Sequence, residues 1–370
     1  MKNMKPSLFA RMLLSFAALS AVGAPNASAT VTNYVGGCAG SPNFTTISAA
    51  LASTPAPNVV EVCPGTYPEQ ILITNPVTLE GIFTSNADQV VITVPSGGLS
   101  VSNVCSETAG PVQVCVAYTG TVNISNVTVD GSGAAVSGGI LYLSSSGTLN
   151  QIETRFQEGE GDSMGIGFIG YANTVTVKNS NLHDFGNIGI LVQDNSASGD
   201  ELTATIEGNT LVPDPTASFG ILTNRGKSVT VSGNSIDGPS TPSCKEVGCA
   251  GIRVSQTASA GSVSKNKVFG VGSGGAGITI LSGAATMSVT SNTVFDIAGD
   301  GIQLYVAGLK ATGNNLMQVQ NGINLECNAD SSVTGNTMTA IHSVGLANVP
   351  SGAIPVNYYY DAPTLYSTCP

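Results

Sequence analysis

The sequence predicts an all-β solenoid, in which short parallel strands wind into a single-stranded β-helix. The main evidence is a repeat: an element of Gly, Ile or Leu, any residue and an apolar residue recurs every 21 to 31 residues. Its glycines, the last in a weaker form of the element, are Gly139, Gly165, Gly189, Gly220, Gly251, Gly277, Gly301, Gly322 and Gly345. One such unit cannot bury its own apolar residues, so stacked neighbours must supply the core.

Two further observations distinguish a β-helix from a helical repeat. The units are short period-2 runs of Val, Ile and Thr punctuated by Gly, Asn and Ser, whereas helical repeats need long runs of period 3.6. Asparagine recurs at one place in the unit, with Ser180 in the same slot one coil earlier; the asparagines are Asn209, Asn234, Asn266, Asn292, Asn314 and Asn336. Stacked about 4.8 Å apart, such amides can form a hydrogen-bonded ladder. We therefore interpret them as structural rather than as ligand contacts.

Residues 1–29 are expected to be a secretory signal peptide. Lys2, Lys5 and Arg11 form a basic region, residues 12–22 are apolar, and residues 27–29 form a small-residue cleavage site. The apolar run is too short to span a membrane, and we find no second candidate. We therefore expect a secreted or periplasmic protein that begins near Thr30. It would retain nine cations and 23 acids, a formal charge of −14, which argues against nucleic acid as a partner.

The eight cysteines all follow the cleavage site, which in an exported chain favours disulfides over metal ligation. Their order suggests local pairs, although eight cysteines allow 105 connectivities. The pairs we favour are Cys38–Cys63, Cys105–Cys115, Cys244–Cys249 and Cys327–Cys369. Zinc is not expected, because no CxxC pair exists and the two histidines, His183 and His342, lie far apart in the repeat.

The mature chain opens with a predicted helix and a group of strands. Residues 44–53 have apolar residues at helical spacing after a Thr-rich start, so we predict a short amphipathic helix that caps the open end of the solenoid. Residues 59–81 follow as three short strands separated by Pro-Gly and Asn-Pro turns.

This opening resembles the first coil of the pectate-lyase-like superfamily of right-handed parallel β-helices, which includes pectate lyases, pectin methylesterases and polygalacturonases. Gly-Thr-Tyr-x-Glu at residues 65–69 is similar to the corresponding turn of pectin methylesterases. With the repeats, the resemblance covers residues 34–347. It implies the fold more than a chemistry, since the matching residues are those that build coils. We expect a right-handed β-helix over residues 30–347 and a tail, 348–370, packed on the last coils.

The remaining segments carry further expectations. Residues 122–130 predict a pair of strands, and the Cys105–Cys115 pair should tie a protruding loop. The four acids of residues 153–162 suggest either a Ca²⁺ site or a solvated turn. The long coils between Gly189 and Gly251 carry insertions that can frame a binding site. The aromatic tail should lie back over the last coils with Cys369 as its anchor, while Tyr358–Tyr360 could instead stack against a sugar.

The outward position of the repeated element indicates where a ligand could bind. In Gly-Ile-x-apolar, Ile and the last residue point inward and x points outward, because a strand alternates faces. Along the axis x is Leu141, Gly167, Leu191, Leu222, Arg253, Thr279, Gln303, Asn324 and Ala347. The early half is apolar or small and the later half is polar. We therefore expect a cover over the early half and an open polar stripe, defined as Arg253, Thr279, Gln303 and Asn324.

The acidic residues beside this stripe match only part of a known catalytic arrangement. Polygalacturonases place catalytic Asp residues just before the Gly of such strands, and Asp300-Gly301-Ile302 is similar to that arrangement. At the next coil, however, Gln320-Asn321 stands where a pair of Asp would be expected. Glu326, two residues beyond Asn324, is the one nearby second carboxylate, and inverting hydrolysis needs two.

The other enzyme families of the superfamily fit no better. Pectin methylesterases use two Asp and an Arg in motifs that this sequence lacks. Pectate lyases need Ca²⁺-binding acids and an Arg base, for which Arg253 is a lone candidate. Alginate epimerases and chondroitin-type lyases need His or Lys bases, yet neither histidine lies on the stripe. His183, next to Asp184, is expected to be a solvated turn residue.

Two functions therefore stay open. The first is an exported, monomeric β-helix protein that binds polysaccharide or serves as an adhesin-like scaffold; the second is a polysaccharide lyase or hydrolase acting on acidic glycans. If it is an enzyme, Arg253, Asp300 and Glu326 are the predicted catalytic residues. The predicted carbohydrate contacts are Thr279, Gln303, Asn321 and Asn324. No cofactor is implied other than a possible Ca²⁺.

Overall fold

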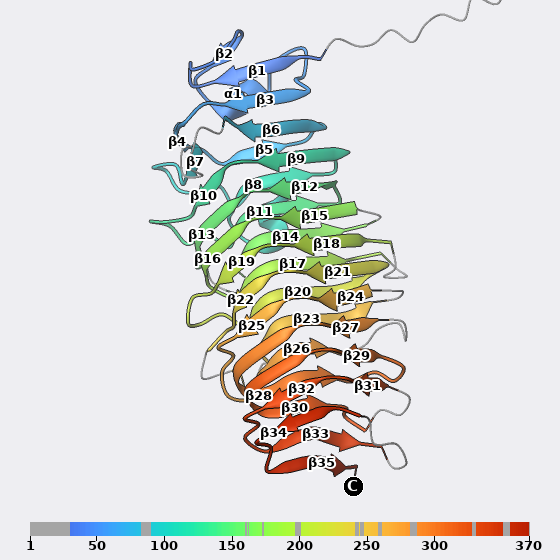
Figure 1. The fold of residues 1–370 in the computed structure, drawn as a ribbon. Helices are drawn as coiled ribbons and strands as arrows, with labels where there is room; N and C mark the ends of the chain where they lie inside the picture. The colour runs from blue at the N-terminus through green and yellow to red at the C-terminus, as the bar shows by residue number, and fades with distance from the viewer. Residues whose placement is uncertain are drawn as a thin grey trace, which may run out of the picture. The chain divides into compact units, whose positions relative to one another are not determined.

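Short parallel strands stack rung upon rung along the chain, as the ribbon of the computed structural model shows (Figure 1). The structure describes residues 30–82, 90–159, 161, 163–171, 174–196, 201–240, 244, 248–257, 261–281, 287–327, 331–350 and 356–369. The expected signal peptide lies outside the described residues. Residues from Val31 onward form one unit of their own, and this unit is described below.

The strands form three columns, which we call faces A, B and C in the order in which each coil visits them. Face A consists of β2 (Asn43–Phe44), β1 (Thr32–Val35), β3 (Val59–Val62), β6 (Val77–Gly81), β9 (Thr121–Ser125), β12 (Ser146–Asn150), β15 (Thr174–Lys178), β18 (Thr203–Glu207), β21 (Ser228–Ser232), β24 (Gly261–Ser264), β27 (Ser288–Thr290), β29 (Lys310–Thr312) and β31 (Ser332–Thr334).

Faces B and C share one continuous sheet. Face B consists of β4 (Gly65–Pro68), β7 (Val90–Thr93), β10 (Thr128–Asp130), β13 (Glu153–Gln157), β16 (Asn181–Phe185), β19 (Thr210–Val212), β22 (Ser235–Asp237), β25 (Lys267–Phe269), the first parts of β28 (Thr293–Leu304) and β30 (Asn315–Asn324), β32 (Thr337–Thr339) and β34 (Tyr358–Tyr360). Face C consists of β5 (Ile71–Ile73), β8 (Val112–Ala117), β11 (Gly138–Leu143), β14 (Met164–Gly170), β17 (Ile188–Asp194), β20 (Phe219–Gly226), β23 (Ala250–Thr257), β26 (Ala276–Ile280), the second parts of β28 and β30, β33 (Val344–Val349) and β35 (Thr364–Thr368).

The repeated glycine is required by the close approach of neighbouring coils. A Cβ added to Gly189 would lie 2.6 Å from the carbonyl oxygen of Gly220 and 2.6 Å from Leu211 Cδ2, and Gly220 meets the carbonyl oxygen of Gly251 in the same way. No side chain fits at such distances, so the glycine column is a steric requirement. The residue after each glycine is inward and buried: Ile190, for example, has 0 % exposure. The glycine repeats in the sequence because every coil packs closely against the next one.

The predicted asparagine ladder is present between faces A and B. The Nδ2 of Asn234 donates to the Oδ1 of Asn266 at 2.9 Å and to the carbonyl of Ile206 at 3.0 Å, and the same pattern recurs up the stack. The ladder extends one coil beyond the prediction, to Asn357. Each slot from Ser180 to Asn336 is preceded by a residue with positive φ, such as Gly233 at 63°, which turns the chain from face A to face B.

The N-terminal helix also matches its prediction. Helix α1 (Ile47–Leu51) begins after Thr46, whose side chain accepts from Ala49 N, and it buries Ile47 against the first strands. Glu69 explains the Gly-Thr-Tyr-x-Glu turn, because its carboxylate accepts hydrogen bonds from the backbone N–H groups of Ile47 at 2.8 Å and Ser48 at 2.9 Å. This motif therefore fastens the end of the solenoid, since helix N–H groups without partners need an acceptor.

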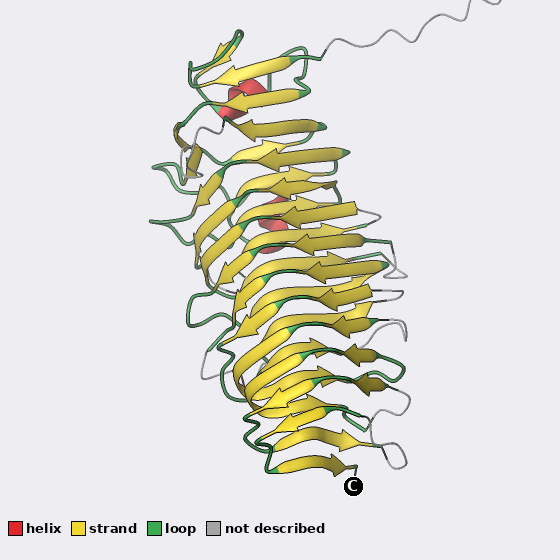
Figure 2. Ribbon diagram, in the orientation of Figure 1, coloured by secondary structure: helices red, strands yellow, loops and turns green. Residues whose placement is uncertain are grey.

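The structure corrects three local expectations and confirms the cysteine pairs. Residues 59–81 contain four strands rather than three. Residues 104–109 form a second helix, α2 (Val104–Ala109), where we expected a loop (Figure 2). The tail does not lie back over the coils, since β34 and β35 pair with β32 and β33 as one more rung. All four predicted disulfides are formed.

Candidate functional site

The outward column of face C runs in register along the solenoid. Strand pairing aligns Leu222 with Arg253, Arg253 with Thr279, Thr279 with Gln303, and Gln303 with Asn324. The predicted stripe is therefore continuous, with one member on each of four successive rungs, about 4.8 Å apart. The sequence pattern alone had placed these residues on one face, and the structure brings them together.

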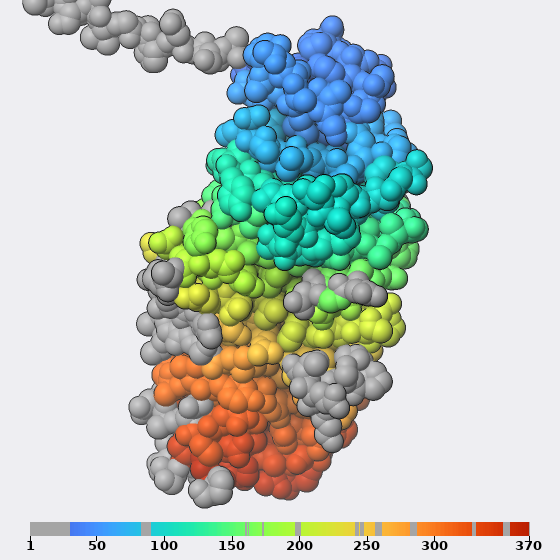
Figure 3. Space-filling model, turned by 180° about the vertical axis from the view of Figure 1, so that it is seen from behind, coloured from blue at the N-terminus to red at the C-terminus, as the bar shows by residue number. Residues whose placement is uncertain are grey.

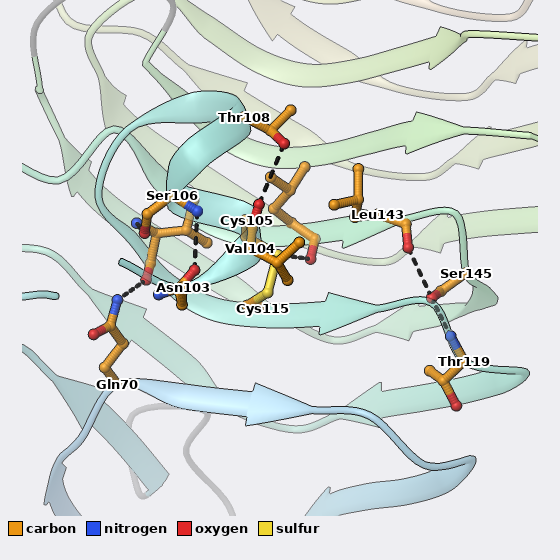
Figure 4. Close-up of a disulfide and its surroundings, with 12 residues drawn as sticks. Gln70, Asn103, Val104, Cys105, Ser106, Thr108, Cys115, Thr119, Leu143 and Ser145 are labelled. Atoms are coloured by element: carbon orange, nitrogen blue, oxygen red, sulfur yellow. Dashed lines mark hydrogen bonds between the residues drawn. A yellow bond between two sulfur atoms is a disulfide. The ribbon is translucent and has the colours of Figure 1, made fainter. Parts of the chain in front are cut away.

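A cover lies over the early half of the same column. Helix α2 packs on face C, and the Cys105–Cys115 disulfide ties it to β8 (Figure 4). Leu141 is fully buried beneath this cover and Leu191 is only 6 % exposed. From behind, the segment around α2 lies over the middle of the surface, in cyan (Figure 3). The expected cover is confirmed, and its helical form explains why so many outward residues of the early half are apolar.

Arg253 begins the open half and lies in a shallow pocket of about 310 Å³. The other lining residues are Gln193, Phe219, Leu222, Asn224, Ser255 and Leu281. The Arg253 Cζ lies 5.3 Å from the centre of the Phe219 ring, a cation–π contact. Its Nε is buried without a hydrogen-bond partner, and no carboxylate among the described residues pairs with the guanidinium. Burial lowers the pKa of Arg253, and the nearby Tyr305 opposes this shift. Arg253 is thus a partly desolvated cation without an anionic partner in the described part of the chain.

Asp300 holds polar side chains of its own rung and of the next rung in place. Its Oδ2 accepts from Gln303 Nε2 at 3.0 Å and from Asn324 Nδ2 at 2.9 Å, and its Oδ1 accepts from Asn321 Nδ2 at 2.8 Å. Asp300 as a residue is only 8 % exposed. Asp300 is thus an acceptor for three amides, and these contacts orient the predicted binding residues rather than leave the carboxylate free for proton transfer.

Glu326 joins this network through Asn324. The Asn324 Nδ2 that bonds Asp300 also donates to Glu326 Oε1 at 2.8 Å, and Asn324 Oδ1 accepts from Glu326 N at 3.1 Å. Although β30 ends at Asn324 and Glu326 has a φ of 47°, its side chain returns to the stripe. Two carboxylates bridged by one nitrogen are closer than the roughly 6.5–9.5 Å typical of an inverting hydrolase.

Tyr305 belongs to the site, and the sequence argument did not identify it. It follows Gln303 by two residues, is 40 % exposed, and makes no hydrogen bond through its hydroxyl within the described part of the chain. Burial raises the pKa of Tyr305, the charges of Glu326 and Asp300 raise it further, and Arg253 opposes them. The hydroxyl therefore lies between charges of opposite sign and stays protonated at neutral pH. Side chains two residues apart in a strand lie on the same face, so counting two residues on from Gln303 would have identified Tyr305.

A second polar cluster on face B corrects our prediction for His183. The residue is in strand β16 rather than in a solvated turn, and its ring nitrogens lie 2.8 Å from Glu153 Oε1 and 2.7 Å from Asp184 Oδ2. Burial lowers the pKa of His183, but both carboxylates outweigh it and leave the pKa raised. Arg155 completes the cluster, bonding Asp130 at 3.0 Å and Glu153 at 3.3 Å.

The acidic segment 153–162 forms a strand over its first part. β13 covers residues 153–157, where Glu153 is engaged by His183 and Arg155, while Glu160 and Asp162 lie outside the described residues. Within the described ranges, no three His, Cys, Asp or Glu side chains are grouped to hold a metal ion. The possible Ca²⁺ site stays a prediction.

Several solved structures are similar to this chain. The A-module of the mannuronan C-5 epimerase AlgE4 from Azotobacter vinelandii is 12% identical, with 84% of this chain and 88% of that chain covered and a TM-score of 0.45. PfbA, a surface adhesin of Streptococcus pneumoniae, is 12% identical, with 84% and 85% covered and a TM-score of 0.50. An alginate lyase from Paenibacillus sp. is 16% identical, with 70% and 91% covered and a TM-score of 0.43.

At such identities the likeness concerns the fold alone. The search of curated proteins gave no match. The family model described as the right handed beta helix region matches residues 164–357, more than half of the chain. This match covers the glycine column from Gly165 onward, the asparagine ladder and the stripe. The chain therefore belongs to the right-handed β-helix family.

Proposed function

We propose that the protein binds an acidic polysaccharide along the stripe, with Arg253 holding a sugar carboxylate. The observation that carries this proposal is the state of Arg253: its guanidinium is half-buried over Phe219, lines a pocket, and pairs with no carboxylate of the described chain. A desolvated arginine without an anion gains most from a ligand that supplies one, and a planar carboxylate accepts two parallel N–H bonds from it.

Gln303, two rungs beyond Arg253, supplies a partner for sugar hydroxyls. Gln303 and Asn324 are oriented by Asp300, and Thr279 Oγ1 lies 3.5 Å from Gln303 Oε1. Side chains fixed in this way lose little conformational freedom when a ligand binds. Thr279 and Asn324 are only 4 % and 7 % exposed, so a glycan lying parallel to the axis would contact mainly Arg253 and Gln303.

Because the chain is negatively charged overall, it needs a local cation such as Arg253 to bind an acidic polysaccharide. The full sequence has a formal net charge of −11, so its general field repels an acidic chain. Binding must therefore come from a short-range contact at Arg253 rather than from long-range attraction. The same reasoning disfavours nucleic acid, which requires a basic surface that tracks the phosphates.

Polysaccharide cleavage by a lyase or hydrolase is the second candidate. The observation that favours it is the proximity of a protonated tyrosine, Tyr305, to a cation and to two carboxylates. The amide contacts of Asp300 and Glu326 weigh against it, because Asn324 occupies the position between the two carboxylates that a water or a glycosidic oxygen would need. We therefore favour binding over catalysis.

Export is part of the proposal. The disulfides are typical of proteins in oxidising compartments. No helix in the described ranges has the length and apolar character needed to cross a membrane. A signal peptide over residues 1–29 stays a prediction, which N-terminal sequencing of the exported protein would check.

The test compares Arg253→Lys and Arg253→Ala with the wild type. Binding to oligouronates is measured by calorimetry, while reducing-end and unsaturated-product assays report turnover. We expect binding without product, a loss of about tenfold or more for Arg253→Ala, and a clear loss even for Arg253→Lys, because lysine cannot make the bidentate contact. Unchanged affinity in both variants would refute the proposal, and turnover that Asp300→Asn abolishes would favour the enzyme.

A further inference from the structure

Three functional groups on or beside the stripe have no hydrogen-bond or ion-pair partner within the described part of the chain. They are the guanidinium of Arg253, the hydroxyl of Tyr305 and the Oε2 of Glu326. Asp300 differs from them, since its two oxygens already accept three amide hydrogen bonds. A ligand on the stripe therefore meets a cation, a neutral donor and an anion.

These three groups follow one another along the axis. Strand register places Arg253 two rungs before Gln303 and three rungs before Asn324, to which Glu326 is bonded. Tyr305 directly follows β28, the strand that holds Gln303. The charges therefore lie at opposite ends of the stripe, about three rungs or roughly 14 Å apart. The environment of Tyr305 agrees with this placement, because Glu326 raises the pKa of Tyr305 and Arg253 opposes it.

Among the described residues, no Lys or Arg forms an ion pair with Glu326 at the acidic end. No Lys or Arg follows Lys310 in the sequence, and Lys310 is in β29 on face A. In a homopolymer of uronic acids every sugar carries a carboxylate, so one would lie beside Glu326 with nothing to neutralise it. Such a like-charge contact in a partly desolvated site opposes binding. The gain at Arg253 would be offset at Glu326.

We propose that the ligand is a heteropolysaccharide in which uronate residues alternate with uncharged sugars, and that Glu326 excludes homopolyuronates. This inference rests on the proposed binding function. Arg253 holds a uronate carboxylate, while Glu326 accepts a hydrogen bond from a hydroxyl or an acetamido N–H of an uncharged sugar. Specificity thus comes from one attractive and one repulsive contact on the same stripe.

The experiment measures the affinities of two oligosaccharide probes of equal length. One is a hyaluronan fragment, in which glucuronate alternates with N-acetylglucosamine, and the other is oligogalacturonate. We expect the wild type to prefer the alternating probe by about tenfold at low ionic strength, and the preference to weaken as salt screens the repulsion. Glu326→Gln should raise the affinity for oligogalacturonate about three- to tenfold, because it removes the charge and keeps the shape.

Glu207→Gln is the matched control, since it removes the same charge from face A, away from the stripe. It should leave both affinities unchanged, which separates a local contact from the general field. If Arg253→Ala weakens binding but Glu326→Gln leaves oligogalacturonate affinity unchanged, or the wild type binds both probes equally, the alternating-ligand inference is wrong and the binding function stands. If neither probe depends on Arg253, the proposed function itself fails.

Discussion

The two halves of face C share one backbone plan and differ in what their outward side chains face. In the early half, Leu141 is buried under α2 and Leu191 is buried in the same apolar cluster, whereas in the open half Arg253 and Gln303 are partly exposed. Both halves point Ile or Val inward with the same register. The comparison shows that the outward positions of face C can be apolar or polar without changing the inward packing. A stretch in which these positions are polar and uncovered is therefore a candidate binding surface.

The halves also differ at the corner between faces A and B. The slot that holds the ladder from Asn209 onward is filled in the covered half by Val127, Ile152 and Ser180. Apolar packing and a disulfide-tied helix stabilise the first half, and a chain of buried amides stabilises the second. The open half must keep its register without help from an outer layer, and the amide ladder supplies it, because each asparagine bonds the next coil.

The largest expected effect sharpens the contrast between covered and open positions. Leu141→Asn puts an amide beneath α2, where the wild-type residue has 0 % exposure, and should lower the free energy of unfolding by about 4 kcal/mol. The matched variant Gln303→Leu removes one of three hydrogen bonds to Asp300 and should cost about 1 kcal/mol or less. Urea unfolding measures both; similar costs would mean that α2 is not a true cover.

An intermediate effect is expected from the ladder of the open half. Asn266→Ala removes the bonds to Val231 and Asn292 and leaves the N–H groups of Asn234 without their acceptor. We expect a loss of about 3 kcal/mol in unfolding free energy. Ser180→Ala, at the edge of the ladder, should cost about 1 kcal/mol. Equal losses would show that the slot contributes alike in both halves.

The smallest expected effect concerns His183 in the covered half. Its pKa is raised in the folded protein by Glu153 and Asp184, which outweigh burial. A raised pKa contributes stability that is fully present below the unfolded value of about 6.5 and is lost as the pH rises through the folded value. Wild type should therefore exceed His183→Gln in stability more at about pH 5.5 than at about pH 8.5, by less than about 1 kcal/mol.

Thermal unfolding at the two pH values checks this expectation, with an NMR titration of the His183 ring as the direct measure of its pKa. The other groups that face the ring are Arg155, which shares Glu153, and Phe156, whose ring centre lies 6.3 Å away. A difference between wild type and variant that is larger at high pH would contradict the assignment, since it would require a lowered pKa.

The features that the sequence determined by itself are those that repeat. A glycine in every coil, an asparagine slot and alternating Ile and Val are each required by contacts with an equivalent residue one rung away, so the period shows them directly. The cysteine pairs were accessible for a related reason, since each closes a local segment. The stripe was predicted from the same alternation of inward and outward residues, and the pairing of neighbouring strands confirms that its members are aligned.

Only the tertiary structure decided the features that occur once. Helix α2 has six residues, too few to be stable without the face it covers, so its sequence alone does not indicate a helix. His183 and Tyr305 acquire their roles from carboxylates 21 to 30 residues away that neighbouring rungs bring beside them. Such contacts depend on how neighbouring coils align. The residue pattern of one strand does not predict which residues of the next coil lie beside it.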